Sequence, residues 1–93
     1  MRISSYKVPE GKLVKVKLWV DSDRIQQITI HGDFFLHPED AIQTIEKSLV
    51  GSLKDSKLIE KTITRIMEES GAILIGASSK DLATAIMMAW ESQ

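Results

Sequence analysis

The stretch of sequence that decides the fold is QQITIHGDFFLHPED, residues 26–40. Apolar and polar residues alternate up to Gly32 and Asp33, as they do along a half-buried strand. Two adjacent phenylalanines follow, and then Pro38 and two acidic residues. Proline suits the first helical position, where its missing N–H would be unpaired, and acidic residues favour the positive end of the helix dipole. We therefore predict a strand, a sharp turn and a helix that begins at Pro38.

The residues before this stretch predict two further strands. Residues 3–8 form a short candidate strand that runs into a Pro-Glu-Gly turn. Along residues 12–20 every second side chain is apolar, which places Lys15, Lys17 and Trp19 on the opposite face. This second strand is therefore expected to be buried on one face only.

The apolar faces also predict how the second and third strands pair. A two-residue turn between them would place Leu18 opposite a glutamine. A three-residue turn at residues 22–24 instead pairs Leu18 with Ile28. The same register pairs Val16 with Ile30 and gathers the apolar side chains on one face. We therefore expect the three-residue turn.

Helical spacing of apolar residues follows the decisive stretch. We expect a first helix over residues 38–50, with Gly51 as its stop. A second helix is expected to begin at Asp55 or Ser56, both good caps, and to end at Gly71.

The last part of the chain predicts a short strand and a final helix. Residues 72–76 are too few for a helix and are interpreted as a strand or an extended connection. A helix over residues 80–91 follows, capped by Ser78 or Ser79. The predicted order is β-β-β-α-α-(β)-α, an α+β fold with about three antiparallel strands and helices on one face. We expect residues 1–93 to form a single domain.

Composition narrows the function classes. Hydrophobic residues make up 43% and charged residues 27%, which is ordinary for a soluble globular protein. There is no cysteine, which excludes thiolate metal sites and cysteine nucleophiles. A net charge of −1 gives no field that attracts nucleic acid or anionic lipid, and no apolar run could span a membrane. We therefore expect a cytoplasmic protein without nucleic-acid or membrane partners.

No group of residues points clearly to catalysis. The densest set of titratable side chains could be imagined as a metal site: His31, Asp33, His37, Glu39 and Asp40. A strand face, a turn and a helix start explain these residues more simply. The Gly-Ala-Ile-Leu-Ile-Gly segment from Gly71 lacks the Gly-Lys-Ser/Thr ending of a phosphate loop. We assign no catalytic, cofactor-binding or metal-binding residue to this chain.

Two groups of residues are candidates for a partner interface. One is the polar strand face with Lys15, Lys17 and Trp19, and the other is the turn. An exposed tryptophan often marks a contact surface, although Trp19 could equally lie under a loop. The turn contributes three candidates: Asp33, Phe34 and Phe35.

Several segments resemble the C-terminal accessory domain of lipoate–protein ligase. The similarity is carried by Gly-Lys-Leu-Val at residues 11–14 and by Ile-Thr-Ile-His-Gly-Asp-Phe-Phe at residues 28–35. It continues through Pro-Glu-Asp at residues 38–40 and Leu-Val-Gly at residues 49–51. Residues 7–70 are covered well, and the last helix only loosely.

The resemblance implies a function for a chain that has no visible active site. In the fused ligases this domain follows a larger catalytic domain, whose lipoate and nucleotide motif and essential lysine are missing here. The chain therefore resembles the free-standing small subunit of a split ligase and would form a heterodimer with a separate catalytic chain. The complex would use ATP, Mg and lipoate to form lipoyl-adenylate and then transfer lipoyl to a lysine of an acceptor domain. An independent binding or regulatory module that uses the Lys-Trp face is the alternative.

Overall fold

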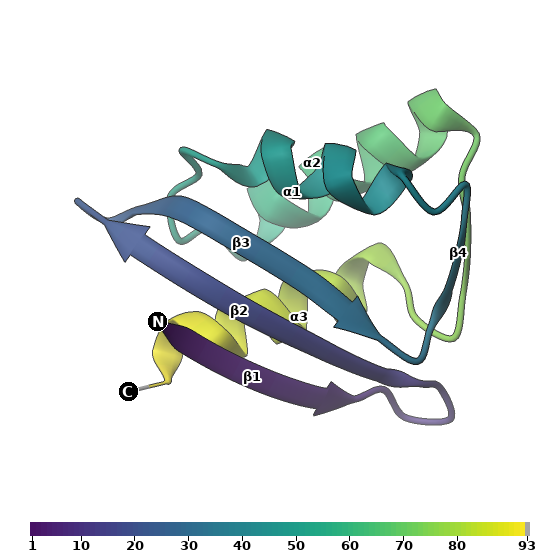
Figure 1. Cartoon of the computed structure of the whole chain (residues 1–93), viewed down its shortest axis with the longest axis horizontal. Coiled ribbons are helices and arrows are strands. Elements are labelled where there is room, and N and C mark those ends of the chain that lie inside the picture. Colours follow the sequence, from purple (N-terminus) through teal and green to yellow (C-terminus); the bar gives the residue numbers. More distant parts are fainter. Residues whose placement is uncertain (93) are drawn as a thin grey trace.

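The computed structural model describes residues 1–92, which form five strands and three helices in an α+β arrangement (Figure 1). In chain order the elements are β1 (Arg2–Lys7), β2 (Leu13–Asp21), β3 (Arg24–Gly32), β4 (Phe35–His37), α1 (Ala41–Leu49), α2 (Ser56–Ser70), β5 (Ile73–Ile75) and α3 (Ser79–Glu91). The predicted order is confirmed apart from β4, which sequence reasoning missed.

The first three strands form an antiparallel sheet in the order β1-β2-β3. Leu18 lies opposite Ile28, and Val16 lies opposite Ile30, as predicted. All four side chains are buried, because this register aligns the apolar faces of the two strands.

The turn between β2 and β3 differs from the prediction. It has two residues, Ser22 and Asp23, both with positive φ (53° and 65°), which suits the twist of a tight hairpin. The pairing then shifts by one residue between Trp19 and Val20, at a β-bulge. The predicted three-residue turn is therefore wrong. The bulge takes up the extra residue, so the short turn and the aligned apolar faces occur together.

The helices cover one face of the sheet. Helix α3 packs on β1 and β2, α1 packs on β3, and α2 lies between the other two helices (Figure 1). The helical side chains at the centre of this layer are fully buried: Ile45, Leu49, Ile59, Ile63, Leu82 and Ile86. Within residues 1–92, no helix has the length and apolar character needed to cross a membrane.

The caps of the second and third helices explain where these helices start and stop. The Asp55 side chain accepts a hydrogen bond from the Leu58 N–H, and Gly71 ends α2 with a left-handed φ of 63°. Ser78 caps α3 in a reciprocal capping box with Asp81. These caps confirm the predicted ends of α2 and the predicted start of α3.

The first helix begins later than predicted, at Ala41 rather than Pro38. The chain leaves Phe34 in an extended conformation because residues 35–37 pair with β5. Residues 38–40 then form a turn, in which the Ala41 N–H donates to the Pro38 carbonyl at 3.1 Å. The predicted positions of the proline and the two acidic residues inside the first helical turn are therefore wrong.

Helix α1 also covers the β3 edge of the sheet. It lies along β3, whose other side is paired with β2 (Figure 1). The Ile30 N–H, which faces away from β2, donates to the Glu46 carboxylate at 2.7 Å. An edge strand with unpaired N–H groups invites pairing with another chain, and this contact satisfies one of them.

We expect Val16→Ala to lower the free energy of unfolding by about 1–3 kcal/mol. Val16 is fully buried, and the substitution removes two methyl groups and leaves a cavity between the sheet and the helices. Urea unfolding followed by circular dichroism measures the change. A loss below about 0.5 kcal/mol, typical of surface positions, would contradict the packing described above.

Candidate functional site

The polar residues singled out in the sequence do not assemble into a reactive group. His31 is exposed on β3, whereas His37 is exposed on β4, and Asp33, Glu39 and Asp40 lie exposed in the connections. Within residues 1–92, no three His, Cys, Asp or Glu side chains are placed to hold a metal ion.

Three of the five most exposed large apolar side chains of residues 1–92 lie on the ribbon formed by β4 and β5. Phe35 lies directly opposite Ile75, and His37 lies opposite Ile73, so the four side chains share one face. We call these four residues the ribbon face. Phe35, Ile73 and Ile75 are 55%, 57% and 59% exposed, and the His37 ring stacks on Phe35 with 6.4 Å between ring centroids. Three large apolar side chains exposed side by side are typical of a protein contact surface.

The opposite face of the ribbon holds it to the domain. Leu36 lies opposite Leu74, between the residue pairs of the ribbon face. Leu36 is buried, and Leu74 is half-buried against the main core. The alternation along each strand therefore fixes which apolar residues stay outside, because Leu36 and Leu74 cannot leave the core without losing buried apolar area.

Backbone contacts tie both strands of the ribbon to the sheet at the end where Phe35 lies opposite Ile75. The Lys12 N–H donates to the Gly76 carbonyl at 2.8 Å, and the Asp33 N–H donates to the Leu13 carbonyl at 3.0 Å. Gly32 passes so close to Leu13 that a β-carbon at Gly32 would overlap the carbonyl oxygen of Leu13. The glycine of the Gly-Asp-Phe-Phe turn is therefore required by this close approach. As a result, the ribbon has a fixed position relative to the sheet.

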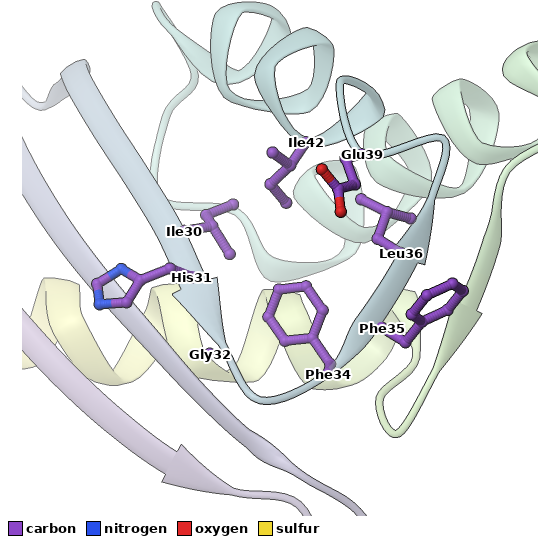
Figure 2. Close-up of a pocket in the computed structure, with 8 residues that line it drawn as sticks. All are labelled: Ile30, His31, Gly32, Phe34, Phe35, Leu36, Glu39 and Ile42. Atoms are coloured by element: carbon purple, nitrogen blue, oxygen red, sulfur yellow. The ribbon is translucent and has the colours of Figure 1, made fainter.

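A pocket of about 230 Å³ opens beside the ribbon. Figure 2 shows that four apolar side chains converge on it, from β3, from the turn and β4, and from α1: Ile30, Phe34, Leu36 and Ile42. The carboxylate of Glu39 lies at its edge, whereas the His31 and Phe35 rings point away on either side. We call this space the anchor pocket.

The second predicted surface is the sheet face that the helices leave uncovered. Lys15 and Lys17 are exposed there, and Trp19 is half-buried. Lys15 lies opposite His31, and Lys17 lies opposite Thr29, whose hydroxyl oxygen is buried without a hydrogen-bond partner within residues 1–92. This face offers positive charge beside the exposed Ile3, which lies opposite Lys17, and the half-buried Trp19.

Comparison with known proteins identifies the family. The family described as the C-terminus of bacterial lipoate protein ligase matches residues 4–86, which is most of the chain. The chain belongs to this family.

Individual relatives agree with this assignment. The chain is 38% identical over 88 residues to Lipoate-protein ligase A subunit 2 of Thermoplasma acidophilum, covering 92% of this chain and 87% of the relative. It is also similar to a chain from the structural analysis of an archaeal lipoylation system, a bi-partite lipoate protein ligase and its E2 lipoyl domain from Thermoplasma acidophilum. That match has a TM-score of 0.76 and 34% identity, and it covers 90% of this chain and 91% of the other.

The predicted interface residues of this lipoate ligase C-terminal domain lie on two separate surfaces. Lys15, Lys17 and Trp19 lie on the uncovered face of the sheet, whereas the three turn residues lie at the ribbon and the anchor pocket. Phe35 is part of the ribbon face, Phe34 lines the anchor pocket, and Asp33 is exposed between β3 and β4. Sequence reasoning did not predict that Ile73 and Ile75 would be exposed beside Phe35. The short apolar run that contains them gives no sign of which side chains face outward until its pairing with β4 is known.

We expect Phe34→Ala and Phe35→Ala to differ in their effect on stability. Phe34 is half-buried against the core, so its loss should lower the free energy of unfolding by about 1–3 kcal/mol. Phe35 is more than half exposed, and its loss should cost less than about 1 kcal/mol. Thermal or urea unfolding of both variants tests the difference, and equal losses would contradict the assigned orientations of the two rings.

Proposed function

We propose that this chain is the non-catalytic accessory subunit of a two-chain lipoate–protein ligase. It binds a separate catalytic chain and enables that chain to activate lipoate with ATP as lipoyl-adenylate. The lipoyl group is then transferred to a lysine of an acceptor domain. We place ATP, Mg and lipoate on the catalytic chain or within the complex and assign no reacting group to this chain.

The observation that carries this proposal is the extent of the match to a separate ligase subunit. The similarity to Lipoate-protein ligase A subunit 2 covers nearly the whole of both chains, so a stand-alone small subunit of this size has a known counterpart. The ribbon face supports the proposal independently, since an exposed apolar surface on a small domain calls for a partner.

The ribbon face is the contact surface that we favour for the catalytic chain. Its core is aromatic and aliphatic, as are the buried centres of protein interfaces, and it is held rigidly by the sheet. The face with Lys15, Lys17 and Trp19 is the second choice, because exposed lysines are depleted at such centres.

An accessory chain without reacting groups can still accelerate a reaction. It can order loops of its partner, close a cleft or exclude water from the reacting atoms. Any such effect requires that this chain bind one state of the catalytic chain more tightly than another. We propose that the favoured state is the one that forms the adenylate.

Pyrophosphate exchange tests the proposal. The purified catalytic chain is incubated with lipoate, ATP, Mg and labelled pyrophosphate, with and without this chain. Exchange that depends on this chain supports the accessory role. Equal exchange in both reactions overturns it and favours an independent binding module, and exchange by this chain alone reveals a missed active site.

A further inference from the structure

We propose that the anchor pocket receives one large apolar side chain of the catalytic chain, and that a lysine or arginine beside that side chain pairs with Glu39. This inference rests on the proposed function and specifies the chemistry of the partner surface. The anchor pocket adjoins the ribbon face at Phe35, which borders the pocket while its ring points away from it (Figure 2).

The size of the anchor pocket suits a single side chain. Its volume of about 230 Å³ is below the range of about 300–1,000 Å³ that is typical of small-molecule sites. Four apolar side chains from three segments of the chain line it (Figure 2). Protein interfaces commonly place one aromatic or aliphatic anchor in a pocket of this kind, where it contributes much of the binding energy.

The charge around the anchor pocket selects a basic neighbour for that anchor. The lining of the anchor pocket contains one acidic residue, Glu39, and no lysine or arginine, and residues 25–46 contain four acidic residues and no lysine or arginine. Of the four, Glu46 is hydrogen-bonded to the Ile30 N–H, whereas Asp33, Glu39 and Asp40 are exposed. The ion pairs of residues 1–92, Lys54–Glu91 and Arg65–Glu69, involve none of these three. Negative charge beside an apolar pocket complements an apolar side chain with a cation next to it.

The negative charge of Glu39 argues against two alternative occupants of the anchor pocket. A carboxylate such as lipoate, or a nucleotide phosphate, would place negative charge beside Glu39 and be repelled. A second copy of this chain, docked symmetrically through the ribbon face, would bring residues 33–40 near their own equivalents and oppose like charges. A basic, apolar surface of the catalytic chain avoids both conflicts.

Two variants of the full chain test the inference by their affinity for the catalytic chain in isothermal titration calorimetry. Glu39→Lys reverses the charge at the pocket, and Ile42→Trp fills the pocket from α1. Each should weaken binding at least about tenfold. Raising the salt concentration should weaken binding of the native chain but not of the Glu39→Lys chain, because screening removes an attraction that only the native chain makes.

The control variant is Asp21→Lys, which makes a comparable change of charge at the exposed end of β2. Figure 1 places that end of the sheet away from β4, along the longest axis of the molecule. The affinity of the Asp21→Lys chain for the catalytic chain should stay within about twofold of that of the native chain. The reason is that residue 21 lies far from the proposed interface and shares no contacts with it. Circular dichroism establishes that each variant is folded. Because Glu39 is exposed, Glu39→Lys keeps the test valid even if Ile42→Trp fails to fold.

The outcomes separate the inference from the proposed function. If Glu39→Lys and folded Ile42→Trp both bind with native affinity, the inference is overturned while the accessory role stands. Methyl signals of Ile30 and Ile42 that shift with lipoate alone would overturn it as well, since they would place a small carboxylate in the anchor pocket. If the native chain does not bind the catalytic chain at all, the proposed function itself fails.

Discussion

Ile75→Asp should weaken the complex with the catalytic chain by at least about 100-fold, or about 3 kcal/mol. Ile75 is 59% exposed in the free chain and lies opposite Phe35 on the ribbon face. Burying an isoleucine side chain contributes about 1.5–3 kcal/mol, and burying an unpaired carboxylate in its place adds a further cost. Titration calorimetry with the purified catalytic chain measures the difference.

Leu58→Asp is the matched control for this variant. Leu58 is 58% exposed in the first turn of α2, which begins at the end of the molecule away from β4 (Figure 1). The control therefore also replaces an aliphatic side chain of nearly equal exposure by aspartate. The affinity of the Leu58→Asp chain for the catalytic chain should be close to that of the native chain. If both variants bind equally well, the ribbon face is not the contact surface. Ile75→Thr, which keeps the β-branched shape, should give an intermediate loss if apolar area is what matters.

Transfer from preformed lipoyl-adenylate should depend on this chain much less than activation does. We expect omission of the chain to lower pyrophosphate exchange by at least about tenfold, which corresponds to about 1.4 kcal/mol in the activation barrier. Transfer of lipoyl from supplied adenylate to the acceptor domain should fall by less than about twofold under the same conditions. The reason is that binding is proposed to favour the adenylate-forming state of the catalytic chain.

The two half-reactions are measured separately with the same protein preparations. Labelled pyrophosphate reports activation, and mass spectrometry of the acceptor domain reports transfer. Equal losses in both steps would mean that this chain supports the general stability of its partner rather than one step. A loss in transfer alone would assign the chain to the second half-reaction.

Local signals in the sequence were enough to predict the elements whose stabilising contacts are made between residues close in the chain. The start of α3 was predicted because Ser78 or Ser79 is a good cap, and the structure shows Ser78 in that role, with Asp81 completing a capping box. The register of β2 and β3 was predicted from the alternation that buries Val16 and Ile30 together. In both cases the decisive residues are neighbours along the chain or in a hairpin.

The parts that were not predicted depend on distant pairing. Residues 35–37 are too short to signal a strand, and residues 73–75, predicted as a strand or an extended connection, give no sign of their pairing partner; β4 and β5 form by pairing with each other. That pairing turns Ile73 and Ile75 outward, delays the start of α1 to Ala41 and creates the anchor pocket beside Phe34. Phe35 was a predicted interface residue because it is an aromatic residue in a turn, whereas Ile73 and Ile75 resemble ordinary core residues in the sequence.

The central claim is that this chain activates a separate catalytic chain by binding it through the ribbon face. Pyrophosphate exchange by the catalytic chain tests it most directly in three parallel reactions: with the native chain, with folded Ile75→Asp, and with no added chain. The native chain and the Ile75→Asp chain are added at the same concentration, chosen below the one at which the variant saturates the catalytic chain. The account predicts rapid exchange with the native chain. With the Ile75→Asp chain it predicts exchange close to that of the catalytic chain alone. Exchange that is equally fast in all three reactions would contradict it.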